Sequence, residues 1–161
     1  MKTLYRGKIA TVSTFKHANK ELLRVAEPDV VVILPLYSGK VIMEKHYRPV
    51  LKKWLLVLPA GHVDGRESPS HAARRELMEE TGYKAAHMAL LFKGYINPGI
   101  MTTLSYTYVA TGLEKSRYNK DKDEKLYIEK HSLSEVRRLI KSNMIIDKKT
   151  ISAVLYYDEF S

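Results

Sequence analysis

The stretch that decides the fold reads GHVDGRESPSHAARRELMEETGY and runs from Gly61 to Tyr83. It gathers four glutamates and three arginines within 23 residues, directly after the apolar run WLLVLPA. Within that run, residues 54–58 are typical of a short buried strand. A dense cluster of charge beside a buried strand indicates a binding or catalytic purpose as well as a structural one.

The middle of this stretch predicts a helix over residues 69–81. Ser68 is a good N-cap, Pro69 suits the first turn, and Gly82 stands where a helix commonly stops. On that helix Glu76 and Glu80 lie one turn apart on the same face, and Glu79 lies beside them.

Three carboxylates on one helix face repel one another unless a positive charge lies over them. Hard oxygen ligands suit Mg²⁺ or Mn²⁺, and the segment offers little that would select zinc. Arg75 is placed to pair with Glu79 at i,i+4 and to hold that carboxylate. The alternative is an exposed helix face laced with salt bridges, which is what most short charged helical strings are.

The longer pattern favours the metal site, because it resembles the Nudix box, G-x5-E-x7-R-E-U-x-E-E-x-G-U, with U apolar or aromatic. Every position is filled without an insertion, by Gly61, Glu67, Arg75, Glu76, Leu77, Glu79, Glu80, Gly82 and Tyr83.

The resemblance implies an α+β fold, an α/β/α sandwich in which helices flank a mixed sheet. It implies metal ligation by the Ala60 carbonyl, Glu76, Glu79 and Glu80, with Mg²⁺ or Mn²⁺ as the cofactor. It also implies catalytic roles for Glu79, Glu124 and Arg75, the last mainly orienting, and structural roles for Gly61, Glu67 and Gly82.

The substrate must be inferred from outside the box. Pro98 lies sixteen positions beyond Gly82, and a proline there marks the ADP-ribose pyrophosphatase group of the family. The stretch EKHYRPVLKKWLLVLPAG resembles the same group and makes Arg48 a substrate-binding candidate. Two departures count against that specificity, since Val57 and Thr103 stand where the group commonly has acids.

The segment RYNKDKDEKLYIEKHSLSEV matches the place where this group has an acidic mobile loop before its last strand and helix. Asp121, Asp123 and Glu124 are the acids available there, and Glu124 is the best positional match to the loop glutamate that closes over substrate. A solvated surface loop is nearly as plausible from the residues alone.

Apolar alternation and turn residues predict the remaining elements. We expect strands at 3–15, 21–27, 29–37, 41–48, 54–58, 86–96 and 101–112, and helices at 69–81, 132–142 and 147–160. Residues 1–27 resemble an extension that the group exchanges between subunits, so a homodimer is expected, with residues 28–161 as the Nudix domain.

Composition bounds the remaining alternatives. The 161 residues are 45% hydrophobic and 28% charged, with a net charge of +9 and no cysteine. The basic residues are interleaved with acids, which favours a solvated surface and remains compatible with an anionic substrate. Without a recognisable signal sequence or membrane span, a cytoplasmic protein with no membrane partner is expected. His46, His62 and His71 lack ligand-like spacing and are expected to be surface or satisfied histidines.

The sequence therefore predicts Mg²⁺-dependent hydrolysis of ADP-ribose or a related nucleoside diphosphate sugar, giving AMP and a sugar phosphate. One alternative is a pyrophosphohydrolase of RNA 5′ ends or dinucleoside polyphosphates, although a nucleic-acid partner is not favoured. Another is a nucleotide-binding module without catalysis.

Overall fold

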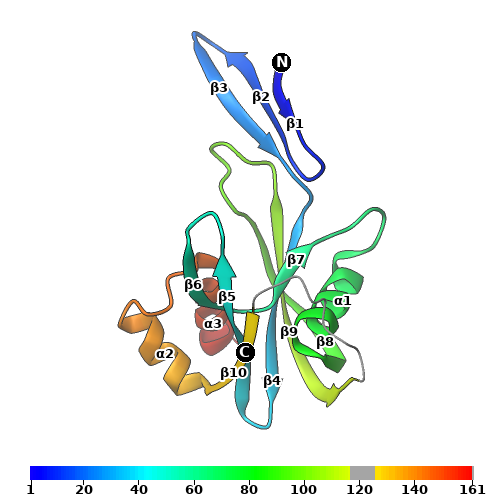
Figure 1. The fold of residues 1–161 in the computed structure, drawn as a ribbon, viewed down its shortest axis with the longest axis vertical. Helices are drawn as coiled ribbons and strands as arrows, with labels where there is room; N and C mark the ends of the chain where they lie inside the picture. The colour runs from blue at the N-terminus through cyan, green and yellow to red at the C-terminus, as the bar shows by residue number, and fades with distance from the viewer. Residues whose placement is uncertain (117–125, 161) are drawn as a thin grey trace.

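The computed structural model describes residues 1–116 and 126–160 of the chain (Figure 1). The strands are β1 (Lys2–Arg6), β2 (Thr11–His17), β3 (Lys20–Ala26), β4 (Val30–Tyr37), β5 (Lys40–Arg48), β6 (Lys53–Val57), β7 (Ala60–His62), β8 (Tyr83–Tyr95), β9 (Leu104–Lys115) and β10 (Leu126–Ser132). The helices are α1 (Pro69–Thr81), α2 (Leu133–Lys141) and α3 (Lys148–Phe160).

The first 26 residues form a separate antiparallel sheet in the order β1-β2-β3, which projects from one end of the molecule (Figure 1). The expectation of one strand over 3–15 was wrong, because the chain turns between β1 and β2. The Gly7 N–H donates to the Ala10 carbonyl at 2.9 Å and closes that turn. The Gly7-Lys8 dipeptide was the available turn signal.

The N-terminal sheet is tied to the body through the turn that contains Pro98. The Val25 N–H donates to the Ile100 carbonyl at 2.7 Å, and the Thr102 N–H donates to the Val25 carbonyl at 3.2 Å. The strand expected from residue 101 begins only at Leu104, because the Met101 N–H is used in a turn onto the Asn97 carbonyl.

The main sheet has seven strands within the described residues, in the order β10-β5-β4-β9-β8, with β6 beside β5 and β7 beside β4. Only the β4–β9 pair is parallel among the pairs of this sheet that the structure describes. The sheet is therefore mixed, as expected for the fold.

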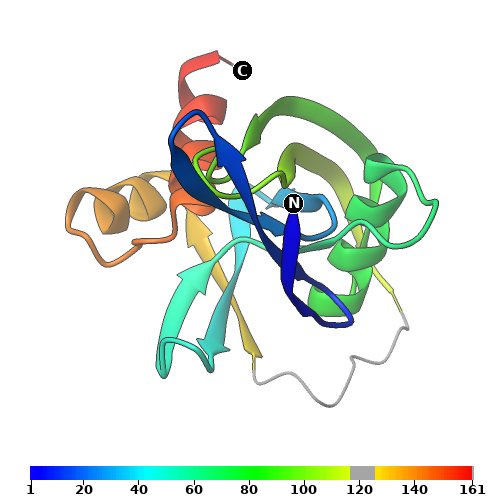
Figure 2. The ribbon, with the colours of Figure 1, turned by 90° about the horizontal axis from the view of Figure 1, so that it is seen from above.

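Helices cover both faces of this sheet, and a hydrophobic core lies on each side. Val31 and Ile33 of β4 pack in the core that α1 covers with Ala72, Ala73 and Leu77. Val32 and Leu34 point the other way, into the core beneath α2 and α3. Figure 2, which looks along the long axis, shows α1 on one side of the sheet and α2 and α3 on the other. The expected α+β sandwich is confirmed.

Strands β4 and β5 share only the pairs next to their hairpin turn, Leu36 with Val41 and Tyr37 with Lys40. Farther along, β4 pairs with β7 and β5 pairs with β6. The two strands thus diverge beyond their hairpin turn. This divergence opens the site described next.

No helix in residues 1–116 and 126–160 is both long enough and apolar enough to cross a membrane.

Candidate functional site

Helix α1 begins and ends where the sequence predicts. The Ser68 hydroxyl accepts a hydrogen bond from the His71 N–H at 3.2 Å, and Pro69 occupies the first turn. Gly82 adopts the left-handed conformation (φ 73°), which a residue with a Cβ rarely adopts, and its N–H donates to the Met78 carbonyl. These two caps fix the register that presents the helix carboxylates.

Arg75 donates hydrogen bonds to several acidic groups on and beside the helix face. Its Nη1 donates to Glu76 Oε1 at 2.7 Å and to Glu79 Oε2 at 3.0 Å, so the predicted Arg75–Glu79 pair forms. Its Nη2 donates to Glu67 Oε1 at 2.7 Å and to the His62 carbonyl at 2.9 Å. A planar guanidinium can hold four acceptors in this way because its donors form a rigid fork.

The charges of this cluster perturb one another. The Arg75 hydrogen bond is the main reason that the pKa of Glu67 falls to about 2, and the Asp64 N–H adds to it. The bond with Glu67 likewise raises the pKa of the Arg75 guanidinium. Burial raises the pKa of Glu76, against the opposing effect of Arg75 and with a further contribution from Glu79. Glu76 therefore lies where an added positive charge would stabilise its ionised form.

The backbone at β7 approaches the helix closely. A Cβ on Gly61 would overlap the carboxylate of Glu76, so a larger residue there would require the Glu76 side chain to move. The preceding N–H, from Ala60, donates to Glu80 Oε2 at 2.9 Å. The box glycine thus lets the β7 backbone lie directly against the carboxylates of α1.

Residues of β7 and α1 line one cavity of about 730 Å³. The sequence-predicted residues that line it are Arg48, Ala60, Gly61, Glu76, Glu79 and Glu80. Its wall also carries His46, Asp64, Lys149 and Glu27. The lining is therefore rich in carboxylates, while Arg48 and Lys149 contribute positive charge.

Glu124, Asp121 and Asp123 lie outside the described residues. Pro98 is exposed in its turn and is not among the residues lining the cavity.

Thr103 and Val57 stand where the ADP-ribose pyrophosphatase group commonly has acids. Thr103 is fully buried, and its hydroxyl donates to Glu27 Oε1 at 3.1 Å. Glu27 in turn lines the cavity, so an acid reaches this region from another segment. Val57 lies opposite Glu44 in the β5–β6 pair, which places a carboxylate on the neighbouring strand.

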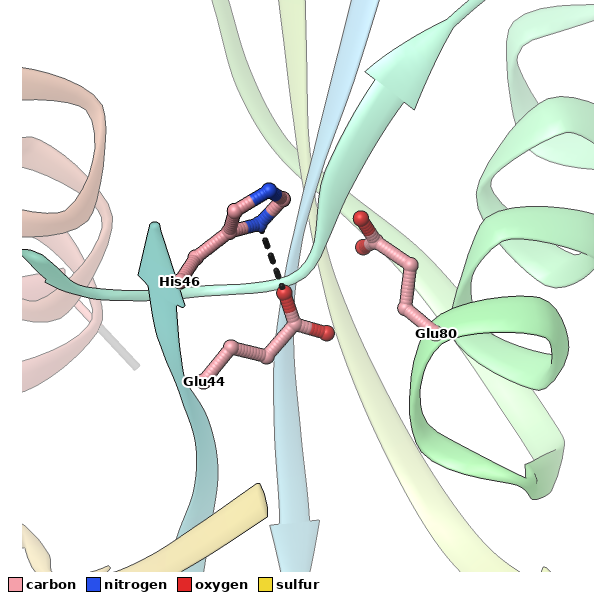
Figure 3. Close-up of side chains that lie close together, drawn as sticks. All are labelled: Glu44, His46 and Glu80. Carbon is pink, nitrogen blue, oxygen red and sulfur yellow. Dashed lines mark ion pairs between the residues drawn. The ribbon is translucent and has the colours of Figure 1, made fainter. Parts of the chain in front are cut away.

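Sequence reasoning missed two residues at the floor of the site, Glu44 and His46. The expectation for His46 was wrong, because its side chain is buried and its Nδ1 has no hydrogen-bond partner in the described structure. Figure 3 shows both side chains of β5 directed toward Glu80 of α1. The available signal was Glu44 within the apolar run VVVILPLY…VIME, two positions before His46 and so on the same strand face. His71 is exposed and pairs with Glu67, as a surface histidine would.

The helix cluster fits a hard divalent cation. Glu76, Glu79 and Glu80 supply carboxylate oxygens, and the Ala60–Gly61 backbone lies against them. Oxygen donors of this kind suit Mg²⁺ or Mn²⁺.

The fold and this site define an α/β/α protein with a carboxylate-lined cavity at the divergence of two strands. A family model described as "NUDIX domain" matches residues 27–153, and the chain belongs to that family.

Two relatives extend along most of the chain. The chain is 34% identical over 142 residues to a "Methanol dehydrogenase activator" of Bacillus methanolicus, which covers 86% of this chain and 76% of the relative. It is 30% identical over 144 residues to an "ADP-ribose pyrophosphatase" of Bacillus subtilis (strain 168), covering 88% and 77%. A solved structure titled "Crystal structure of ADP compounds hydrolase" superposes with a TM-score of 0.85 at 23% identity, covering 99% of this chain and 90% of that one, which supports the fold.

Proposed function

We propose that this protein hydrolyses the pyrophosphate bond of ADP-ribose or a related nucleoside diphosphate sugar, giving AMP and a sugar phosphate, with Mg²⁺ or Mn²⁺ as cofactor. The observation that carries the proposal is the cluster in which Arg75 holds Glu76 and Glu79 while Ala60 binds Glu80, all at one cavity. The likeness to an ADP-ribose pyrophosphatase supports the choice of substrate class.

In this proposal the cation is held by Glu76, Glu79, Glu80 and the Ala60 carbonyl. When bound, the ion neutralises pyrophosphate charge and makes a coordinated water more acidic. Arg75 is a positioning residue, because its bonds end on carboxylates and a carbonyl of the chain. Glu67 and Gly61 are structural in the same sense, one fixing Arg75 and the other making room for Glu76.

Two groups are proposed to accept the proton of the attacking water. Glu79 lines the cavity and is the more exposed member of the helix pair that Arg75 holds, at 30% against 13% for Glu76. Glu124 is proposed on the resemblance alone, because it lies outside the described residues.

The rest of the cavity suits an anionic nucleotide. Arg48 and Lys149 can bind phosphate oxygens, while Glu27, held by Thr103, can accept hydrogen bonds from ribose hydroxyls. Its volume falls in the range of pockets that enclose small molecules.

A cytoplasmic location and a homodimer are also part of this proposal. The cysteine-free sequence agrees with a reducing cytoplasm. The projecting sheet β1–β3 exposes Leu4, Tyr5 and Ile9, which supports the proposal that residues 1–27 build a homodimer.

The test is a turnover screen of the purified protein with Mg²⁺ and then Mn²⁺. Substrates are ADP-ribose, other nucleoside diphosphate sugars, dinucleoside polyphosphates and triphosphorylated RNA, with products separated by chromatography. We expect AMP chiefly from ADP-ribose or a related sugar, and a loss of several orders of magnitude in Glu80→Gln.

Two other outcomes of the screen would indicate a different function. A preference for RNA or dinucleoside polyphosphates would overturn the substrate, and Val57 and Thr103 would then mark a different specificity. Nucleotide binding without turnover in the wild type would favour a binding module.

A further inference from the structure

A second group of potential ligands, Glu44, His46 and Glu80, lies beside the cavity and shares Glu80 with the helix cluster. Glu44 and His46 come from β5 and Glu80 from α1, and one ligand atom of each lies within 4.8 Å of the others (Figure 3). Glu44 is fully buried, and His46 and Glu80 are 7% and 8% exposed.

Strand geometry explains why these side chains meet. Glu44 and His46 are two positions apart, so both point to the same face of β5. Their cross-strand neighbours on that face are apolar, with Val57 and Ile128 opposite Glu44 and Leu55 and Leu126 opposite His46. The Glu44 carboxylate therefore has apolar cross-strand neighbours, and His46 and Glu80 are potential ligand groups close to it.

Glu44 is also unsatisfied. Among the described residues neither of its carboxylate oxygens has a hydrogen-bond partner, and neither has Nδ1 of His46. The two groups form an ion pair of 3.7 Å, between His46 Nδ1 and Glu44 Oε2, when His46 is protonated, and this distance is too long for a hydrogen bond. A buried carboxylate without a hydrogen-bond partner costs roughly several kcal/mol unless a proton or a cation compensates it.

A cation compensates this arrangement better than a proton does. A single proton on His46 compensates only the Glu44 carboxylate, through the 3.7 Å ion pair, whereas one divalent ion accepts a lone pair from all three groups. Three atoms at most 4.8 Å apart leave a centre no more than about 2.8 Å from each, compared with ~2.0–2.2 Å for bound zinc, so each side chain must move by less than ~1 Å.

We propose that Glu44, His46 and Glu80 form a site for one divalent transition-metal ion, represented by Zn²⁺, that is separate from the Mg²⁺-type helix cluster and shares Glu80 with it. One nitrogen and two carboxylates favour such an ion, whereas Mg²⁺ prefers oxygen ligands and keeps several waters. His46 and Glu80 line the cavity, so the ion enters from there and reaches Glu44 beneath.

The experiment measures Zn²⁺ binding to the metal-stripped full chain by competition with a chromophoric chelator. The wild type should bind one ion tightly and lose that binding in Glu44→Gln and in His46→Gln. Each loss should exceed the roughly 10–100-fold weakening that follows removal of an outer supporting group. Excess Mg²⁺ should not displace the Zn²⁺.

Two further variants serve as controls. His131→Gln removes a histidine that also lies beside two carboxylates, Glu129 and Glu135, but nearer the surface, and it should leave the tight site intact. Glu76→Gln disables the helix cluster alone, so it should impair Mg²⁺-dependent turnover while Zn²⁺ binding persists. The transition-metal site and the proposed hydrolysis can thus fail independently.

Thermal unfolding gives a second readout. Zn²⁺ should raise the Tm of the wild type, because an ion that binds only the folded state stabilises it, and should not raise the Tm of Glu44→Gln. Without metal, Glu44→Gln should be at least as stable as the wild type, since it removes an uncompensated buried charge. Equal Zn²⁺ affinity in the wild type and Glu44→Gln, or no tight binding by the wild type, would overturn the proposal.

Discussion

The Thr150 hydroxyl accepts a hydrogen bond from the Leu58 N–H at 3.0 Å across 92 positions of sequence, in the buried core. The same hydroxyl donates to Asp147 Oδ2 at 2.8 Å. Two residues beyond Leu58 lies Ala60, the backbone neighbour of Glu80. The start of α3 therefore fixes the chain segment that leads into the cavity.

Thr150→Val keeps the shape of this residue and removes both hydrogen bonds. Because the Leu58 N–H is then buried without a partner, we expect the free energy of unfolding to fall by about 1–3 kcal/mol in urea denaturation. Thr150→Ser retains the hydroxyl and serves as the control for the packing of the methyl group. Equal losses in both variants would contradict the importance of the hydrogen bond.

Arg75→Lys keeps the positive charge at this position and loses the planar guanidinium with its several donors. A lysine ammonium cannot reproduce the contacts to Glu67, Glu76, Glu79 and the His62 carbonyl together, so Mn²⁺ affinity and kcat should fall by about 10–100-fold. Arg74→Lys is the matched control, since Arg74 donates outward to the Ala85 carbonyl. Wild-type Mn²⁺ affinity in Arg75→Lys would show that charge alone suffices.

Gly61→Ala introduces a Cβ into the space of the Glu76 carboxylate. The side chain of Glu76 must move, and we expect both Mn²⁺ affinity, measured by electron paramagnetic resonance, and turnover to drop by roughly tenfold or more. Gly94→Ala is the control, because a Cβ there meets nothing within 4 Å. The close approach would be unimportant if the two alanine variants behaved alike.

The Glu67–Arg75 pair should affect how the free energy of unfolding depends on pH in the acid range. The pKa of Glu67 is about 2 in the folded protein against an ordinary 4.5, so the unfolded chain takes up more protons as the pH falls. The contribution of Glu67 is thus complete above pH 4.5 and is lost as the pH falls toward 2.

Urea denaturation of the wild type and Glu67→Gln across this range checks the prediction. The variant should be less stable at neutral pH and should lose less stability between pH 4.5 and 2. Glu21→Gln, at an exposed position of β3, should show the same loss of stability between pH 4.5 and 2 as the wild type. Parallel curves for wild type and Glu67→Gln would contradict the linkage.

The sequence predicts helix α1 closely, because its caps, its charge pairs and its spacing are all local. Ser68, Gly82 and the Arg75–Glu79 pair lie within fifteen residues of one another, and the structure has each as expected. The first strand was predicted too long because apolar residues continue across the Gly7 turn.

The cluster of Glu44, His46 and Glu80 was not predicted, for a different reason. The approach of Glu44 and His46 to Glu80 depends on where β5 separates from β4, which is a property of the whole sheet. The short strand β7 escaped prediction too, since its three residues pair with β4 and carry no pattern of their own.

Strand β4 pairs with β5, β7 and β9 and sends alternate side chains into the two hydrophobic cores. Because no local opening can release it while both cores remain packed, the Val31–Leu34 amides should exchange with deuterium only through global unfolding. Their exchange rates would then report the full free energy of unfolding. Since α1 packs in the core that contains Val31 and Ile33, the carboxylates of α1 would then be anchored to the part of the molecule that opens last.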